Sequence, residues 1–342
     1  MISWGDRIQD TGTSSAVRAH ARSCEEAGMA ALWSSEAARD PFLPLALAAD
    51  ATTSLLLGTG IAVAYGRTPY ATAQTAWDLQ RLSRGRFRLG IATQVRAHVE
   101  RRYGTDWLGG AHVLREYVQC CRAVWDSWQN GTLPRFEGQW FRFTLTNPEF
   151  RPAALPAGNE HIPVWIAAVG ADTASMAGEV ADGLHVHAFH TEGYLRDVVL
   201  AAAVRGRERA GRGGCIEATS PVMAGVVHDS RQESILRDRF RTHIAFYAST
   251  PAYAKILEHE GLRDLHDALR PLARERRWDE MPALVDDSTI DRFVVLDEPQ
   301  ALAHRLRVKY DGLLTELCLY RDGATFASAD DLAELVEGLH AN

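Results

Sequence analysis

One stretch decides the fold, and it reads Ile162-Pro-Val-Trp-Ile-Ala-Ala-Val-Gly-Ala-Asp-Thr-Ala-Ser-Met-Ala-Gly-Glu-Val-Ala-Asp-Gly-Leu-His-Val-His187. An apolar run from Ile162 to Val169 ends in a glycine turn at Gly170, and a helix-like segment starts at Asp172. A second apolar run, Gly183–His187, follows the helix. A strand, a crossover helix and a second strand make a βαβ unit, so this part of the chain predicts a parallel sheet.

The glycine turn in this unit predicts an anion site. A helix that starts directly after a glycine turn leaves backbone N–H groups unpaired, and the helix dipole adds positive potential at the same point. A phosphate fits such a place. The second strand delivers His185 and His187, and His190 follows, so polar side chains are expected beside the phosphate site.

Composition indicates a globular protein with a large core. The chain has 342 residues, of which 46% are hydrophobic and 24% are charged. No Pro/Gly/Ser-rich linker divides it, so we expect one domain over residues 1–342, with insertions near 130–160 and 249–285. The net charge of −7 and the pI near 6.0 argue against nucleic acid and anionic membranes as partners.

The cysteines and the N-terminus indicate a cytoplasmic protein. Five cysteines are odd in number and scattered, with no CxxC motif, which suits a reducing compartment. The segment from Met1 to Asp6 lacks a charged and then apolar signal pattern. No apolar stretch approaches the length that spans a membrane.

Strands and helices alternate along the chain, which predicts an α/β fold of the (β/α)8 TIM-barrel type with insertions. A hairpin turning at Glu137-Gly138 is expected within Arg135–Thr146, and a mostly helical excursion over Ser249–Val285. The expected strands are Met1–Ile8, Ala31–Ser35, Leu55–Tyr65, Phe87–Ala92, Ile162–Val169, Gly183–His187, Ala218–Val227 and Leu313–Tyr320. The expected helices are Ser14–Ala27, Pro44–Thr53, Pro69–Ser83, Leu114–Gln129, Asp172–Val180, Glu192–Ala210, Arg231–Tyr247 and Pro299–Tyr310.

In a barrel of this type the chemistry gathers at the carboxyl ends of the strands. The residues found there give no nucleophile and base pattern: there is no GxSxG motif and no cysteine matched to a nearby histidine. A cofactor is therefore expected to supply the reactivity. Before the phosphate turn, the strand ends offer Ser34, Ser35, Glu36, Tyr65, Arg67, Thr93, Gln94 and His98.

Several ordered segments resemble the bacterial luciferase-like superfamily of flavin-dependent oxidoreductases. They are Leu57-Gly-Thr-Gly-Ile-Ala-Val-Ala-Tyr, Arg67-Thr-Pro, Gln74-Thr-Ala-Trp-Asp-Leu and Leu82-Ser-Arg-Gly-Arg-Phe-Arg-Leu-Gly-Ile-Ala-Thr-Gln. The resemblance continues through Ile162–Gly183 to Phe293–Tyr310 and is strongest to a subfamily dependent on a deazaflavin, coenzyme F420. It implies a luciferase-like barrel whose cofactor is FMN or coenzyme F420.

The resemblance also places the cofactor on particular residues. A bulge in the third strand, often with a non-proline cis peptide, backs the flavin ring, and Gly60 suits a bulge with close ligand approach. Residues after the fourth strand bond the polar edge of the ring, and the glycine turn holds the phosphate. The cofactor-binding residues implied are Gly60, Ile61, Ala62, Thr93, Gln94, Ala168, Val169, Gly170, Ala171 and His187.

This chain departs from the resemblance at one catalytic position. Many deazaflavin-dependent relatives carry an Asp-His pair after the second strand, and here the residues are Glu36 and Ala37. A histidine exchanges protons near neutral pH, so His98, His187 and His190 become the acid/base candidates, with Glu36 as a further catalytic candidate.

We therefore expect a flavin-dependent oxidoreductase that acts on a small organic substrate. Reduced FMN would make it a monooxygenase, with a flavin reductase as partner, whereas coenzyme F420 would make it a hydride-transfer enzyme; a homo-oligomer, as a dimer, is expected in both cases. A metal-dependent hydrolase using His185 and His187 is an alternative, because alternate residues of a strand share a face. A flavin-binding protein without catalytic activity is another.

Overall fold

Eight strand positions form one parallel sheet that closes on itself in the computed structural model, which describes residues 2–8, 12–320 and 328–340. The order around the sheet is β3, β2, β1, β13, β10, β9, β8 and β5, and β5 pairs again with β3. The (β/α)8 TIM barrel expected from the sequence is confirmed. Its strands are β1 (Ser3–Arg7), β2 (Ala31–Ser34), β3 (Leu56–Thr59), β5 (Phe87–Ala92), β8 (Val164–Ala168), β9 (Gly183–Val186), β10 (Glu217–Val222) and β13 (Glu316–Leu319).

The helices between the strands follow the expected spacing, and several have side-chain caps. The hydroxyls of Thr13 and Thr68 accept from the first turns of α1 and α3, and the carboxylate of Asp229 does so for α9. The ranges are α1 (Ser14–Glu26), α2 (Leu43–Ala51), α3 (Pro69–Leu82), α5 (Ala111–Asn130), α6 (Ala171–Val180), α7 (Glu192–Tyr194), α8 (Ala201–Arg209), α9 (Ser230–Ser249), α13 (Pro299–Tyr310) and α14 (Ala329–His340).

The expected third strand, Leu55–Tyr65, is not continuous. It consists of β3 and a short β4 (Ala62–Val63), followed by a 3-10 turn, Ala64–Gly66. Both pieces pair with β5, which itself was expected with its observed bounds. The apolar run reads as one strand because its buried residues are apolar on both sides of the break, and periodicity does not report where pairing stops.

Two further differences concern the last third of the chain. The expected strand Ala218–Val227 is split into β10 and β11 (Ala224–Val226), and β11 pairs with β12 (Val295–Asp297) in a separate two-stranded sheet. The sequence pattern predicts neither β12 nor the last helix, α14. The N-terminal strand begins at Ser3, and Met1 of the expected Met1–Ile8 lies outside the described residues.

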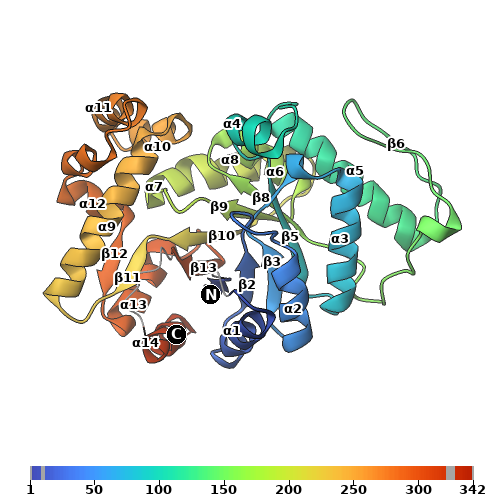
Figure 1. Ribbon diagram of the computed structural model, residues 1–342, viewed down its shortest axis with the longest axis horizontal. Coiled ribbons are helices and arrows are strands. Elements are labelled where there is room, and N and C mark those ends of the chain that lie inside the picture. Colours follow the sequence, from blue (N-terminus) through green and yellow to red (C-terminus); the bar gives the residue numbers. More distant parts are fainter. Residues whose placement is uncertain (1, 9–11, 321–327, 341–342) are drawn as a thin grey trace. The chain divides into compact units, whose positions relative to one another are not determined.

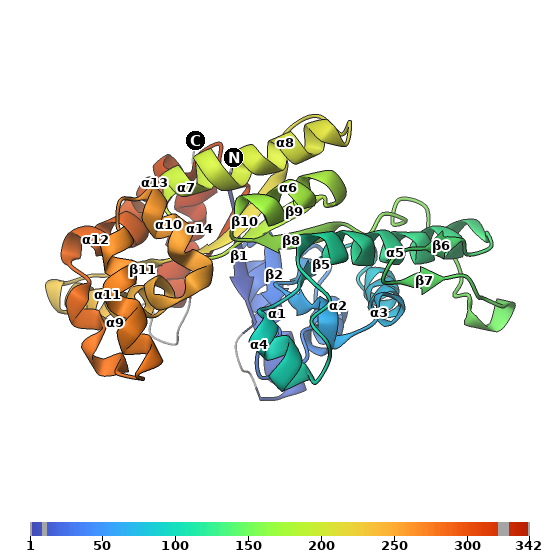
Figure 2. The same ribbon diagram turned by 90° about the horizontal axis from the view of Figure 1, so that it is seen from above.

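The two segments expected as insertions have the local structure predicted for them, a hairpin and helices, whereas their status as insertions in one domain stays a prediction. The first is a hairpin of β6 (Phe136–Glu137) and β7 (Arg142–Phe143). Its turn spans residues 138–141, where Gly138 N–H donates to Phe141 O at 2.9 Å, and Glu137 of the expected Glu137-Gly138 turn belongs to β6 instead. Buried Glu116 of α5 holds this turn by accepting three backbone N–H groups. Figure 2 shows the hairpin beside α5.

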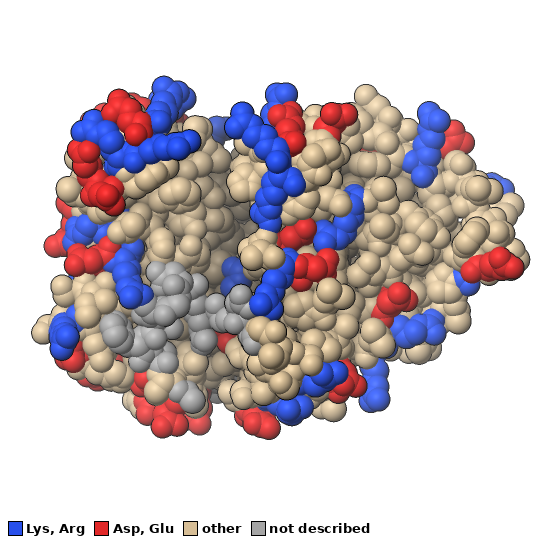
Figure 3. All heavy atoms as spheres, viewed as in Figure 1, with Lys and Arg blue, Asp and Glu red and all other residues tan. Residues whose placement is uncertain are grey.

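The second segment is helical and rich in acidic and basic side chains. It contains α10 (Ala254–His259) and α11 (Arg263–Arg274), and α12 (Asp287–Phe293) follows it. Arginines of α9 pair with acids of α12, as in the contact of Arg237 with Asp291 at 2.8 Å. On the face drawn in Figure 3, basic and acidic side chains are interspersed.

The chain forms two compact units. One contains residues 1–4, 186–201 and 218–342, and the other contains residues 5–185 and 202–217. Figure 1 labels the helices and strands along the chain. The expectation of one domain over residues 1–342 stays a prediction. Within the described residues, no helix combines the length and the hydropathy needed to cross a membrane.

The barrel interior of the larger unit is filled by aromatic side chains. Trp33 of β2 lies 5.7 Å from Trp165 of β8 and 4.4 Å from the ring of His185 on β9, centroid to centroid. Small residues make room for these rings: a Cβ on Gly58 or Gly183 would lie less than 3.0 Å from an indole. The interior is therefore a packed core, and the strand ends are left to carry function.

Candidate functional site

The residues expected to back a flavin ring lie in the break between β3 and β4. The Gly60–Ile61 peptide bond is cis. The carbonyl oxygen of Gly60 accepts a hydrogen bond from Ser35 Oγ at 2.8 Å and another from Arg7 Nη2. Arg7 and Ser35 come from the ends of β1 and β2, so two neighbouring strands fix the orientation of this peptide.

Gly60 is tightly enclosed on the side where a side chain would stand. A Cβ there would lie 3.2 Å from Trp33 Cβ, 3.5 Å from Arg7 Nη2 and 3.6 Å from His185 Cε1. A larger residue at this position would therefore press on the barrel interior. Its effect on a ligand would be indirect, through displacement of the Gly60–Ile61 peptide.

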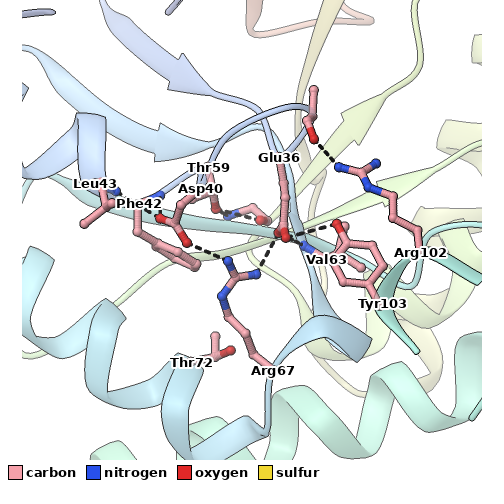
Figure 4. A network of polar contacts seen from close by, with 12 residues as sticks. Glu36, Asp40, Phe42, Leu43, Thr59, Val63, Arg67, Thr72, Arg102 and Tyr103 are labelled. Atoms are coloured by element: carbon pink, nitrogen blue, oxygen red, sulfur yellow. Dashed lines mark hydrogen bonds and ion pairs between the residues drawn. The ribbon is translucent and has the colours of Figure 1, made fainter. Parts of the chain in front are cut away.

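Glu36, a catalytic candidate, is the centre of a polar network at the end of β2 (Figure 4). Its buried carboxylate accepts from Val63 N at 2.7 Å, from Arg67 Nη1 at 2.7 Å and from the Tyr103 hydroxyl at 3.0 Å. Arg67 also reaches Asp40 at 2.7 Å. The carboxylate of Glu36 thus holds β4 and two side chains in place.

The network shifts the pKa values of its partners. Burial would lower the pKa of Arg67, but the hydrogen bonds and charges of Glu36 and Asp40 outweigh it and raise the pKa. Burial raises the pKa of Tyr103, and the Glu36 carboxylate raises it further. Both groups therefore keep their protons over the neutral range, and Tyr103 remains a donor to Glu36.

Thr93 and Gln94 follow β5, as expected, and both are partly exposed. Gln94 has a positive φ of 66, and its Oε1 accepts from Val95 N at 3.0 Å. Gly90, inside β5, has no room for a side chain, because a Cβ would lie 1.8 Å from Thr59 O. β3 and β5 therefore approach closely at Thr59, next to the Gly60–Ile61 peptide.

His98 lies apart from the Glu36 network, although the helical segment that follows His98 contacts this network. The residue is exposed at the end of a short helix, α4 (Arg96–His98). The π-helix that follows, Val99–Tyr103, contains Arg102, which donates to Ala37 O, and Tyr103, which donates to Glu36. No described contact joins the His98 ring to Glu36.

The expected phosphate turn has the predicted local geometry. β8 ends at Ala168, and Gly170 is the N-cap of α6, with φ −117 and no side-chain cap. A Cβ on Gly170 would meet no atom within 4 Å, so open space adjoins the start of the helix. The first-turn N–H groups of α6 and this space fit a phosphate group. Asp172 is exposed in the first turn of α6, and its negative charge would repel a phosphate there.

His185 belongs to the barrel interior. Burial, together with the nearby charges of Arg7 and Arg88, lowers its pKa to about 3. The imidazole is therefore neutral at physiological pH. Within the part of the chain that the structure describes, neither His185 nor His187 belongs to a group of three or more potential metal ligands, so the metal-dependent hydrolase is not favoured.

His187 and His190 lie together in the smaller unit. The Nδ1 of His187 accepts from Phe189 N at 3.1 Å, and its Nε2 lies 3.1 Å from the Tyr253 hydroxyl. His190 Nδ1 donates to the backbone carbonyl of His187 at 2.7 Å. Burial lowers the pKa of His190 to about 4. His187 thus contacts a second proton-carrying side chain, and the described contacts of His190 are structural.

Three residues of these networks were not identified from the sequence: Arg7, Tyr103 and Tyr253. Arg7 carried a weak signal, as a charge at the end of a short apolar strand. Tyr103 and Tyr253 carried none, because each acts through a partner that is far away in the sequence, Glu36 or His187.

Comparisons with known proteins agree with this architecture. A family model described as luciferase-like monooxygenase matches residues 3–316. The chain is 41% identical to "Uncharacterized protein Rv1360" of Mycobacterium tuberculosis, over 82% of this chain and 83% of that protein. It is 29% identical to the F420-dependent hydroxymycolic acid dehydrogenase of the same species, over 65% of this chain and 62% of that protein.

A solved structure gives the same fold. The coenzyme F420 dependent tetrahydromethanopterin reductase from Methanopyrus kandleri superposes with a TM-score of 0.78 and covers 98% of both chains. At 18% identity, this similarity shows the fold alone.

Proposed function

Because the chain belongs to the luciferase-like monooxygenase family and is an oxidoreductase of that family, we propose that it transfers hydride between a deazaflavin, coenzyme F420, and a small organic substrate. The observation that carries the choice of coenzyme is the 29% identity to a dehydrogenase named as F420-dependent. The alternative of FMN-dependent oxygenation is kept as an outcome of the test.

We propose that the coenzyme ring lies against the backbone of Gly60, Ile61 and Ala62. Ser35 and Arg7 support this arrangement, because they fix the Gly60 carbonyl from the barrel side. Thr93 and Gln94, which follow β5, would bond the polar edge of the ring. When bound, the coenzyme supplies the hydride.

The coenzyme phosphate would bind at Ala168–Ala171. Support comes from the uncapped start of α6 and the open space at the Cβ position of Gly170. Backbone N–H groups, rather than side chains, would make the contacts. We also propose His187, which follows β9, as a coenzyme contact, as the family resemblance implies.

The proton that accompanies hydride transfer would come from His187 and Tyr253. Because Phe189 N–H donates to Nδ1, the neutral His187 ring carries its proton on Nε2, which faces the Tyr253 hydroxyl. Burial raises the pKa of Tyr253 to about 12, so this hydroxyl is protonated at neutral pH. Tyr253 therefore holds a proton that it would pass to the substrate as negative charge develops there, and the Nε2 proton of His187 would replace it. Glu36, engaged by three protein donors, would position the site.

Partners and location follow from this proposal. The substrate is a small molecule, and we expect a homodimer; a flavin reductase is needed only if FMN is the cofactor. The described cysteines form no disulfide, which supports a cytoplasmic location.

Oxygen dependence separates the two reaction classes. The purified protein is mixed with reduced F420 and a panel of carbonyl and imine compounds without oxygen, and in parallel with reduced FMN and oxygen. We expect coenzyme oxidation in the first series that tracks substrate reduction one to one. If product forms only in the second series, by oxygenation of the substrate, the proposed hydride transfer is wrong and the protein is a monooxygenase.

A further inference from the structure

A group of potential metal ligands lies between β1 and α1. Asp6 Oδ2 is 3.4 Å from His20 Nε2 and 3.9 Å from Cys24 Sγ, and the sulfur is 3.7 Å from the imidazole nitrogen. Among residues 2–8, 12–320 and 328–340, no other group of three or more His, Cys, Asp or Glu side chains brings its ligand atoms together in this way.

These distances are close to those of a tetrahedral zinc site. Zinc binds oxygen and nitrogen at about 2.0–2.2 Å and sulfur at about 2.3 Å, so neighbouring ligand atoms in a tetrahedron lie about 3.4–3.6 Å apart. The Asp6–His20 distance already has this value, and the two distances to Cys24 exceed it by a few tenths of an ångström. A small rotation of one side chain would close the difference.

The backbone explains why the three groups meet. His20 and Cys24 are four residues apart on α1, so they share one face of the helix. Asp6 and Arg7 are successive residues of β1 and point to opposite faces of the sheet. Arg7 reaches the Gly60 carbonyl, whereas Asp6 faces α1. The site is therefore separate from the proposed coenzyme site.

The donor set favours zinc over harder cations. Magnesium and calcium prefer oxygen ligands, whereas a carboxylate, an imidazole and a thiolate together suit zinc. Asp6 and Cys24 are both buried, and a divalent cation would balance the two negative charges of carboxylate and thiolate. The His20 side chain is 24% exposed, which leaves a path for the cation and for a water molecule as fourth ligand.

We propose that Asp6, His20 and Cys24 bind a zinc ion with three protein ligands and one open position. The ion ties α1 to β1 and so steadies the strand that supplies Arg7. Binding requires loss of the Cys24 thiol proton, and no oxidation or reduction takes place. This proposal does not depend on the choice of coenzyme.

Cobalt serves as the spectroscopic substitute for zinc in the test. The full-length protein is stripped with a chelator and titrated with Co²⁺. We expect one equivalent to produce the visible bands of four-coordinate cobalt and a thiolate-to-cobalt charge-transfer band, both removed by one equivalent of Zn²⁺. Absence of the charge-transfer band in the folded wild-type protein would overturn the proposal and leave an Asp6–His20 ion pair beside a thiol.

Variants locate the site. Cys24→Ser should abolish the charge-transfer band and weaken binding at least about tenfold, because a neutral hydroxyl replaces a thiolate ligand. Cys215→Ser is the matched control, since Cys215 is exposed and distant in sequence, and it should bind as the wild type does. Should Cys24→Ser fail to fold, His20→Ala removes a partly exposed ligand instead, and unchanged cobalt affinity in that variant contradicts the assignment.

Discussion

Arg7 Nη2 lies 2.7 Å from Ser35 Oγ, and both groups donate to the carbonyl oxygen of Gly60. The ends of β1 and β2 thus hold the peptide that the proposed coenzyme ring would contact. This contact links the barrel scaffold to the ring site, and the first prediction tests it.

Replacing Ser35 with Ala removes one of the two donors to Gly60 O. We expect a loss of about 1 kcal/mol in the free energy of unfolding and a severalfold loss of coenzyme affinity, because the peptide is less firmly oriented. Urea unfolding and a fluorescence titration measure the two effects. The control is Ser249→Ala, which also loses a bond to a backbone carbonyl, that of Phe246 at 2.7 Å. An equal affinity loss in both variants would show that stability, and not the ring site, is responsible.

Gly170→Asp tests the phosphate turn. The added Cβ meets no atom within 4 Å, so the fold should persist, while the carboxylate repels a phosphate at the start of α6. We expect coenzyme affinity to fall at least tenfold, about 1.4 kcal/mol. Asp172→Asn removes a charge from the same turn and should strengthen binding. The assignment fails if neither affinity changes in folded protein.

Acid/base chemistry is predicted to depend on His187 and Tyr253. His187→Ala should lower the single-turnover rate by roughly two to four orders of magnitude with coenzyme saturating, and Tyr253→Phe should also lower it. The exposed His98→Ala is the control and should keep the wild-type rate. His190→Ala should act mainly on stability, because its Nδ1 bonds a backbone carbonyl. Full rates in both His187→Ala and Tyr253→Phe would assign the proton to another donor.

Stability should fall as the pH drops below neutrality. Burial lowers the pKa of His190 to about 4 and that of His185 to about 3, from an ordinary value of 6.5. Between the folded and unfolded pKa values, the unfolded chain binds more protons than the folded chain does. The stability that the neutral histidines contribute is therefore fully present above pH 6.5 and is lost as the pH falls towards 4. Each histidine contributes up to about 1.4 kcal/mol per pH unit in this window.

Urea unfolding at several pH values between 7 and 4.5 measures this dependence. His190→Gln should make the curve less steep than that of the wild type, because one of the two imidazoles that titrate is removed while His185 stays. A His98→Gln control should leave it unchanged. If the stability of His190→Gln depends on pH as steeply as that of the wild type, His190 is not responsible for the pH dependence.

Much of the barrel was predictable because buried parallel strands are short apolar runs between turn residues. Phe87–Ala92 has the bounds that its sequence indicates. The bulge at Gly60 was expected from the family resemblance, and the structure has a cis Gly60–Ile61 bond there. The pairing of β11 with β12 was not predictable, since an apolar run does not show where its hydrogen-bond partners change. Pairing depends on residues far away in the sequence.

The sequence indicated where the candidate site residues lie along the chain, but it did not indicate which residues they contact. Glu36 was identified because Glu36 and Ala37 stand where relatives carry an Asp-His pair, but its bonds to Val63, Arg67 and Tyr103 depend on how separate loops meet. The role of Arg7 depends on the register of β1 with β2 and on the direction of one carbonyl. The cofactor assignments themselves stay predictions.

Parallel equilibrium titrations of the coenzyme-free protein with F420 and FMN test the central claim most directly. We expect F420 to bind at least tenfold more tightly than FMN, and Gly170→Asp to weaken F420 binding by a comparable factor. Tighter binding of FMN would contradict the proposed hydride transfer from a deazaflavin. Failure of both to bind to the folded protein would contradict the coenzyme site itself.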